Sequence, residues 1–508
     1  MCITLARTGE CRLCLTLWGK ESAIMTLLKN NGKQKENVPE RESSFGMSII
    51  VLLLAIAVLL FGVVGLKLDP HMPILLSVTV LLIYSSYLHI PWNDMRDSIC
   101  RSISESIEAI LIICLIGVTV GTWMSSGTVP LVIYYGLQIF SPQWFLLSIL
   151  LLCCIMSIVT GSSWTTVGTI GVAFMGVGIG LGIPVGLTAG AILCGAYFGD
   201  KQSPVSDTCN FAAAVSRGGL YEVVRAMIYT TGPSLVVSAV IFVVLGFRYG
   251  SGTADTSQIQ AITSGLEASF NLTPVLLIPL ILLLSMIIMK VPAIPTMIIA
   301  SLLGASFTFV VQGQDIASCL KFMHTGYVSD TGVSVIDSLL TRGGLNSMTS
   351  TVMLMLFSLA LAGCLERTGV MSKVIGKISN LTKNRVGLIT TTLVMAMALS
   401  FFAADPYLAM LLPANAMGRN FDRQGIDRRV LGRTIQDGAT VMAPLVPWGT
   451  NGIYCSLTLG VAVAEYAPYY LMGYATPIFA VICAITGFGV LYTKKPGKSD
   501  EVKDVAEA

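Results

Sequence analysis

A stretch without a single charged side chain limits what this chain can fold into. Ala109–Gly199 is 91 residues long and contains no Asp, Glu, Lys or Arg. Because a membrane-spanning helix needs about 20 predominantly apolar residues, this stretch has room for about four crossings or re-entrant hairpins. Further uncharged runs bring the expected number of membrane segments to roughly ten to thirteen: Ser48–Leu66, Met72–Ile90, Ala226–Phe247, Ala268–Met289, Val291–Gln314, Gly343–Leu365, Val386–Ala404, Gly438–Ala464 and Tyr466–Thr493.

The composition of the whole chain agrees with a membrane protein. Of 508 residues, 54% are hydrophobic and 12% are charged, whereas a soluble domain carries about 25% charged residues. Such a chain is neither a soluble enzyme with one large core nor a disordered polymer, and its net charge of +3 indicates no nucleic-acid partner. No segment alternates like an outer-membrane β-strand. We therefore expect an all-α polytopic protein surrounded by a lipid bilayer.

Basic residues near both ends of the chain predict its orientation. Cytoplasmic segments are enriched in Lys and Arg, so we expect both termini and the loop Arg419–Arg433 on the cytoplasmic side of a bacterial cytoplasmic (inner) membrane. Residues 1–24 fit this pattern poorly, and we expect Met25 to be the true start. The Cys11-x-x-Cys14 pair has no second pair or histidine cluster beside it, so no metal site is expected there. The terminal basic residues are Lys29, Lys33, Lys35, Arg41, Lys494, Lys495 and Lys498.

The chain resembles itself at an interval of about 240 residues. No single match is convincing, but four occur in the same order at offsets of 240 to 243. Many secondary transporters consist of two such halves in opposite orientation, with the binding site where broken helices meet. We therefore expect two inverted repeats, which requires an odd number of crossings in each half. The matches are Asp97–Ile99 with Asp337–Leu339, Gly121–Gly127 with Gly363–Gly369, Thr160–Ser163 with Ala403–Pro406, and Pro204 with Pro444.

These matches and the uncharged runs divide the chain into six segments. The expected order is an N-terminal tail at 1–46, leading transmembrane segments at 47–90, a first repeat at 91–247, a connector with transmembrane segments at 248–330, a second repeat at 331–493 and a cytoplasmic tail at 494–508.

The polar segment Gly199–Asn210 is the strongest candidate for a binding site. It follows the 91 uncharged residues, and Pro204 interrupts any helix there because proline lacks a backbone donor. The freed carbonyls and the side-chain oxygens can surround a hard cation such as Na⁺, since unwound backbone at membrane depth is tolerated where it lines a cavity. The alternative is an ordinary extramembrane loop with a Lys201–Asp200 surface pair. The candidate ligands are Asp200, Ser203, Ser206, Asp207, Thr208 and Asn210.

A second polar break lies in the other half of the chain. Pro444 and Pro447 stand three residues apart, which makes a continuous helix implausible. Thr450 and Asn451 are the polar groups after this break, as Thr208 and Asn210 are after the first. Asp437 precedes it and either faces the site or pairs with Arg433, four residues earlier on the same helix.

Two earlier breaks complete the candidate set. Ser162 and Ser163 lie in the uncharged segment Thr160–Thr166 and either supply hydroxyl ligands or are small residues that let helices pack closely. Asp405, followed by Pro406, stands between two apolar stretches, where an unpaired carboxylate is unfavourable, and this favours a functional role. The three histidines lie outside every motif, so any proton handling falls to carboxyl groups. Desolvation raises the pKa of a buried carboxyl group, which lets it bind either H⁺ or Na⁺ near neutral pH.

Gly199–Asn210 resembles the motif of NhaC-type Na⁺/H⁺ antiporters, which reads close to GDK-x-SP-x-SDT-x-N. The family usually has SPLIPWNT where this chain has Ala443 and Gly449 in place of Ser and Asn. It commonly has a polar-Gln-Tyr pattern where this chain has Asp405-Pro406-Tyr407. The resemblance implies the ion transporter superfamily fold of inverted repeats, a scaffold and a moving transport domain, often in a homodimer. Further pieces that resemble the family, within roughly 50–490, are Gly121–Leu137, Thr160–Thr169, Gly343–Met348, Leu365–Gly369 and Ala443–Gly452.

Two hypotheses for function follow. The first is a secondary active antiporter that exchanges internal Na⁺ for external H⁺ by alternating access, with Asp207 as the carboxylate shared by both ions. The second, which the resemblance also admits, is a Na⁺-coupled exchanger of small organic anions or amino acids, such as malate and lactate. In the first, Asp200, Asp405 and Asp437 tune charge or relay protons, and the neutral Na⁺ ligands are Ser206, Thr208, Asn210, Thr450 and Asn451.

Other classes of function are disfavoured. The two-half construction argues against a passive channel. No nucleophile–base pair, metal cluster or phosphate-binding loop supports a membrane enzyme. We expect no cofactor besides the transported Na⁺ and H⁺.

Overall fold

A computed structural model describes residues 41, 43–66, 68–250, 256–289, 291–330, 337, 340–379, 384–403 and 405–492. The expectations about Met25, Cys11, Cys14 and the C-terminal lysines lie outside these ranges, as do parts of two repeat matches, at 338–339 and 404. The described chain is helical without a β-strand; two isolated bridges join Tyr327 to Arg342 and Ile426 to Tyr492. The all-α expectation is therefore confirmed.

Apolar helices long enough to cross a bilayer recur along the chain. Six of the described helices qualify by length and composition, or up to nine when each of three bent pairs counts as one span. Three shorter apolar helices accompany them, at His71–Tyr87, Thr128–Ile139 and Ile294–Val310. The protein is a multi-pass membrane protein. The six are Phe45–Val63, Pro142–Thr160, Ser163–Gly180, Leu220–Tyr249, Leu345–Arg367 and Arg385–Ala403.

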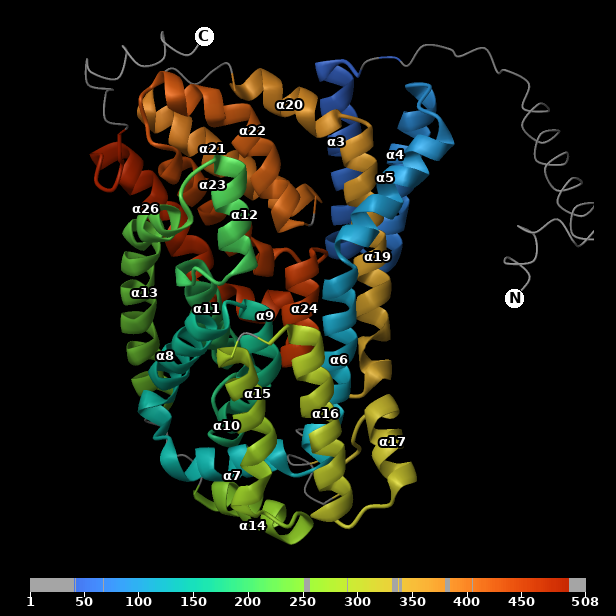
Figure 1. The fold of residues 1–508 in the computed structure, drawn as a ribbon, viewed down its shortest axis with the longest axis vertical. Coiled ribbons are helices and arrows are strands. Elements are labelled where there is room, and N and C mark those ends of the chain that lie inside the picture. The colour runs from blue at the N-terminus through green and yellow to red at the C-terminus, as the bar shows by residue number, and fades with distance from the viewer. Residues whose placement is uncertain are drawn as a thin grey trace, which may run out of the picture.

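In Figure 1 many helices, among them α13 (Leu220–Gly250), α16 (Ala293–Val310) and α19 (Thr349–Arg367), run roughly along the long axis of the molecule. The leading helices are α3 (Phe45–Leu60), η1 (Phe61–Gly65) and α4 (His71–Tyr87). The first half contains α5 (Trp92–Glu105), α6 (Ile107–Ser125), α7 (Thr128–Ile139), α8 (Pro142–Thr160), α9 (Ser163–Thr166), η2 (Val167–Gly171), α10 (Val172–Gly180), α11 (Val185–Gln202), α12 (Asp207–Ser216) and α13 (Leu220–Gly250).

The connector and the second half continue in the same manner. The connector contains α14 (Thr256–Ser269), η3 (Pro274–Leu277), α15 (Ile278–Ile288), α16 (Ala293–Val310) and α17 (Ile316–Thr325). The second half contains η4 (Leu345–Met348), α19 (Thr349–Arg367), α20 (Val370–Ser379), α21 (Arg385–Ala403), α22 (Pro406–Arg423), α23 (Arg428–Met442), η5 (Ala443–Leu445), α24 (Thr450–Leu459), α25 (Val463–Tyr466), η6 (Ala467–Tyr469) and α26 (Leu471–Thr486).

Helix boundaries recur in the two halves at a constant interval. α8 and α21 both contain 19 residues, α12 and α24 both contain 10, and each pair is offset by 243 positions. Left-handed turn residues recur at the same interval, Gly182 with Gly425 and Arg217 with Gly460. This register places Pro204 opposite Pro447, which corrects the sequence match with Pro444. Helix caps fix a register more sharply than a single shared residue type.

Close packing recurs at the same interval. A Cβ atom on Gly195 would lie 2.4 Å from the carbonyl oxygen of Leu150, and one on Gly438 would lie 2.7 Å from that of Leu393. Both contacts join equivalent helices, α11 to α8 and α23 to α21, and glycine is what allows such a close approach. Figure 1 shows the equivalent helices α7 and α20 near opposite ends of the molecule. This is the arrangement expected for inverted halves, although the inversion itself stays a prediction.

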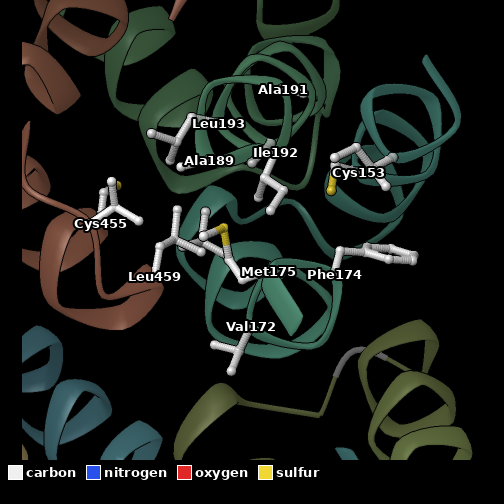
Figure 2. Packing of buried hydrophobic residues seen from close by; sticks show 14 of the residues in the cluster. Cys153, Val172, Phe174, Met175, Ala189, Ala191, Ile192, Leu193, Cys455 and Leu459 are labelled. Atoms are coloured by element: carbon white, nitrogen blue, oxygen red, sulfur yellow. The ribbon is translucent and has the colours of Figure 1, made fainter. Parts of the chain in front are cut away.

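Helix α11 lies in the interior of the molecule, since nearly every residue in it is buried. Figure 2 shows its side chain Ile192 close to Met175 of α10, with Leu459 of α24 on the other side of that methionine. The apolar core thus joins first-half helices to a second-half helix. The last turn of α11, which carries Asp200, is thereby held in the buried interior.

Candidate ion-binding site

A cavity of about 920 Å³ lies between two groups of helices. Residues of α5, α6, α15, α16 and α19 line one side, and residues of α9, α11, α12, α22, α23 and α24 line the other. Within each group the helices pack on one another, α5 on α19, α6 on α16, and α12 and α22 on α23. The cavity is acidic, because its lining contains one arginine, Arg101, and six carboxyl side chains: Glu105, Glu108, Asp200, Asp207, Glu366 and Asp405.

Asp200 is the most buried of the six carboxyl residues, with 2% of its surface exposed. The Ser163 hydroxyl donates to Asp200 Oδ2 at 2.8 Å, and the Ser206 hydroxyl donates to Oδ1. The Thr208 hydroxyl lies 3.4 Å from Oδ1 and 3.0 Å from the Ser206 hydroxyl. One carboxylate and three hydroxyls therefore form a cluster of oxygen atoms, the ligand type that hard cations prefer.

The cluster forms where the chain is unwound between two helices. α11 ends at Gln202 and α12 begins at Asp207, so the break around Pro204 is present as expected. Ser206 caps α12 by accepting from Cys209 N, while its hydroxyl proton serves Asp200. The break thus brings residues of two helix ends to one carboxylate.

Other residues of the same motif lie elsewhere. Asp207 is exposed to the cavity, and the Tyr407 hydroxyl of α22 donates to its Oδ2. Ser203 donates to the Ile158 carbonyl at 2.7 Å, and Asn210 Nδ2 donates to the Ser206 carbonyl at 2.7 Å. Neither Ser203 nor Asn210 lines the cavity; both hold the break in shape.

The second-half break contributes neutral groups to the same side of the cavity as Asp200. Thr450 and Asn451 begin α24, are nearly buried and line the cavity. Asn451 Oδ1 accepts two hydrogen bonds at 2.7 Å, from Trp164 Nε1 and from the Tyr197 hydroxyl. Trp164 is itself fixed by stacking on Tyr454, with ring centroids 4.4 Å apart.

Two helix caps complete the lining. Ser162 caps α9 by accepting from Thr165 N at 3.1 Å, and Asp405 caps α22 by accepting from Leu408 N at 2.8 Å. The two residues are 243 positions apart, so they occupy the same place in the two halves. An acidic cap offsets part of the positive end of the α22 dipole.

Asp437 lies outside the cavity lining, in a buried charge cluster behind it. Lys201 donates to Asp437 Oδ1, and both side chains are 0% exposed. The Thr230 hydroxyl donates to the same oxygen at 3.0 Å. Neither alternative for Asp437 describes its position, because it does not line the cavity and its ion-pair partner is Lys201. Lys201 is accordingly buried and is not part of a surface pair with Asp200. Arg433 instead donates to the Gly489 carbonyl at 2.7 Å.

Sequence reasoning missed four contributors to the site. Glu366 lines the cavity, while its neighbour Arg367 pairs with Asp94 at 2.7 Å. Gln436 donates to the Thr208 hydroxyl at 3.0 Å and so orients the cluster. Tyr197 and Trp164 orient Asn451. Only Tyr197 had a usable signal, because it precedes Asp200 by three residues on the same helix face.

Comparison with known proteins shows the family of the chain. A profile of the Na⁺/H⁺ antiporter family matches residues 195–488. The chain is 34% identical over 452 residues to the Na⁺/H⁺ antiporter NhaC of Alkalihalophilus pseudofirmus, which covers 89% of this chain and 97% of that protein. It is 37% identical over 446 residues to the malate-2H⁺/Na⁺-lactate antiporter of Bacillus subtilis, and this match covers 88% of this chain and 95% of that protein.

A third relative transports a different solute. The arginine/ornithine antiporter ArcD of Halobacterium salinarum is 33% identical over 466 residues, covering 91% of this chain and 96% of that protein. All three relatives are antiporters by name, and each match covers nearly the whole of both chains. The chain belongs to the Na⁺/H⁺ antiporter family.

Proposed function

We propose that this protein is a secondary active antiporter that exchanges Na⁺ for H⁺ across a bacterial cytoplasmic membrane. The observation that carries the proposal is the buried Asp200 carboxylate, surrounded by three hydroxyls at the junction of two broken helices. Ionisable groups buried within a membrane protein mark ion pathways or relays. The six carboxyl groups of the cavity support a cationic substrate, because they attract cations and repel anions.

The shared site works by competition at one carboxylate. When Asp200 is ionised, Na⁺ binds against it, with the oxygens of Ser163, Ser206 and Thr208 turned toward the ion. When Asp200 is protonated, its charge is neutralised and Na⁺ is released. The site holds either Na⁺ or H⁺ but not both. When the site has carried one ion across the membrane, it therefore carries the other ion on its way back, in the opposite direction.

Asp207 remains a second candidate for this role. It lies on the same cavity and was the first choice from the motif. Its exposure and its bond to Tyr407 favour a place on the approach to Asp200, where it concentrates cations. The two helix groups on either side of the cavity support alternating access by relative movement, which would expose the Asp200 cluster to each side in turn.

The experiment measures lumenal pH in acid-loaded proteoliposomes when NaCl is added outside. Wild-type protein should alkalinise the lumen, Asp200→Asn should not, and Asp207→Asn should show a weaker response. Asp97→Asn is the matched control, because Asp97 is exposed and lies outside the cavity. No Na⁺ response from folded wild-type protein would overturn the proposal, and a silent Asp207→Asn beside an active Asp200→Asn would move the shared site to Asp207.

A Na⁺-coupled exchanger of organic solutes is the second candidate function. One observation favours it: the cavity volume of about 920 Å³ far exceeds what one cation requires, since a water molecule takes about 30 Å³ of the liquid. Substrate-dependent Na⁺ uptake into the same proteoliposomes separates the two functions.

A further inference from the structure

The two groups of helices that flank the cavity also touch each other directly, at a contact that does not line it. Gly168 of η2, which continues α9, lies between Ile116 of α6 and Tyr454 of α24. A Cβ atom on Gly168 would lie 2.6 Å from the Tyr454 hydroxyl oxygen and 3.1 Å from Ile116 Cδ1. All three residues are buried, and none of them lines the cavity. We call Ile116, Gly168 and Tyr454 the closed set.

The closed set is joined to the ion cluster through one residue. The Tyr454 hydroxyl donates to the Trp164 carbonyl at 2.6 Å, and the rings of these two residues stack. Trp164 lines the cavity and directly follows Ser163, whose hydroxyl donates to Asp200. A separation at the closed set would therefore take place next to the residues that hold Asp200.

The interval of 243 positions relates the closed set to residues that face the cavity. Its three counterparts in the other half of the chain all line the cavity. One of them belongs to α19, in the same helix group as α6, and the other two belong to α22 and α12, in the other group. They therefore lie on the two sides of the cavity instead of in contact. These counterparts, which we call the open set, are Leu359, Leu411 and Phe211.

The aromatic neighbours of the two sets repeat as well. Trp164 and Tyr454 have ring centroids 4.4 Å apart, and their counterparts Tyr407 and Phe211 have ring centroids 5.2 Å apart. In Figure 1 α12 and α22 lie toward the end of the molecule that carries α20, while α10, which follows η2, lies toward the end that carries α7. Equivalent parts thus occur at two places, and the places differ in whether the opposing helix group is in contact.

We infer that the closed set is the gate of a second path to the ion cluster, between α6 and η2, and that it separates when the open set comes together. Because the two sets are equivalent in the repeat, a contact made at one has a counterpart at the other. Packed helix interfaces change between discrete arrangements and do not deform continuously. The inference rests on the alternating access of the proposed function and adds the residues that close each path.

The two gates differ in one residue that favours the observed arrangement. Gly168 has no side chain, which lets Ile116 approach the backbone of η2 closely. Its counterpart Leu411 fills the equivalent place with a branched side chain. The closest approach is therefore possible at the closed set only, and a side chain at position 168 should shift the balance toward the other arrangement.

The test measures how fast a small water-soluble maleimide labels a cysteine introduced into each set, Ile116→Cys or Leu411→Cys, in the purified full-length protein. Mass spectrometry of the peptide that carries the new cysteine separates its signal from that of the native cysteines. Gly168→Ala forces a methyl group against Ile116 and Tyr454. With Gly168→Ala added, labelling of Ile116→Cys should rise about fivefold or more, and labelling of Leu411→Cys should fall by a similar factor.

A control and a second variant make the result decisive. Gly232→Ala is the matched control, because a Cβ atom there meets nothing closer than the Ile228 side chain at 3.5 Å, so both labelling rates should stay at their starting values. Ile116→Ala, measured through Leu411→Cys alone, removes the other side of the contact and should also slow that labelling, which covers the case in which Gly168→Ala does not fold. Unchanged labelling in either folded variant, or labelling of both cysteines that rises together, would overturn the inference.

The labelling assay is independent of transport. It uses no ion gradient, and Na⁺-evoked alkalinisation is measured separately in proteoliposomes. Opposite changes in labelling without any Na⁺ response would support the gate and contradict the exchange function, whereas a Na⁺ response with unchanged labelling would contradict the gate alone.

Discussion

The two chain breaks that meet at the cavity occupy the same place in the helix order but have opposite chemistry. The first lies between α11 and α12, and the second lies between η5 and α24. With the interval of 243 positions, Asp200, Asp207 and Thr208 correspond to Ala443, Thr450 and Asn451. The helix frame is thus repeated, while at these equivalent positions only the first half carries carboxylates. A repeated fold positions two breaks at one cavity, and in the proposed mechanism the carboxylate of the first break is the one that holds the ion.

The largest expected effect separates the two breaks by transport. Asp200→Asn removes the buried charge and should lower Na⁺/H⁺ exchange by about a hundredfold or more, in line with the loss of a buried charge partner. Thr450→Val changes a neutral group in the second break and should lower exchange less than about tenfold, as expected for one neutral hydrogen-bonding group. Initial rates of Na⁺-evoked alkalinisation check both values. Equal losses would contradict a site centred on the first half.

The buried ion pair between the halves should show the largest effect on stability. Lys201→Met leaves the Asp437 carboxylate buried without its cation, which costs about 3–5 kcal/mol. Replacing both residues, Lys201→Met with Asp437→Leu, should recover most of that loss because no charge stays buried. Thermal unfolding of the purified variants in detergent measures the difference. A double variant no more stable than the single one would show that the pair does more than neutralise charge.

The paired glycine contacts test how closely the two halves repeat. Gly195→Ala and Gly438→Ala each force a methyl group against the backbone of the neighbouring helix, which should destabilise the protein by about 1–3 kcal/mol. We expect similar values, because each glycine meets residues at equivalent positions of α8 or α21. The same unfolding assay measures both. If only one variant were destabilised, the equivalence of the two contacts would be refuted.

The smallest effect concerns the turns after α12 and α24. Gly460 has a φ of 70°, so Gly460→Ala should cost about 1 kcal/mol. The equivalent Arg217 already adopts a φ of 59° without being glycine, so Arg217→Ala should change stability by less than about 0.5 kcal/mol. Unfolding temperatures measured side by side give the comparison. A costly Arg217→Ala would indicate a role for the arginine side chain itself.

The sequence predicted the features that depend on local chemistry. Long uncharged runs indicate membrane helices wherever they occur. Pro204 interrupts its helix because of its own backbone, and a break between two helices is also present at Asp405-Pro406, as expected. These properties belong to a few neighbouring residues, so they can be recognised without knowing what lies across the fold.

The features that the sequence did not predict depend on contacts between distant residues. Asp200 and Asp207 are seven positions apart in one motif, but Asp200 is buried against Ser163 of α9 while Asp207 is exposed. Lys201 finds its partner 236 residues away. The amide orientation of Asn451 is set by residues 287 and 254 positions away. No local pattern encodes such pairs.

The most direct test of the central claim is the dependence of the half-saturating Na⁺ concentration on pH. If Na⁺ and H⁺ compete for the Asp200 carboxylate, that concentration should rise by about tenfold for each unit of pH below the pKa of the site, while the maximal rate stays the same. The measurement uses wild-type proteoliposomes over a series of pH values, with Asp97→Asn as the matched control. A half-saturating Na⁺ concentration that is independent of pH, with a maximal rate that falls instead, would contradict a shared carboxylate.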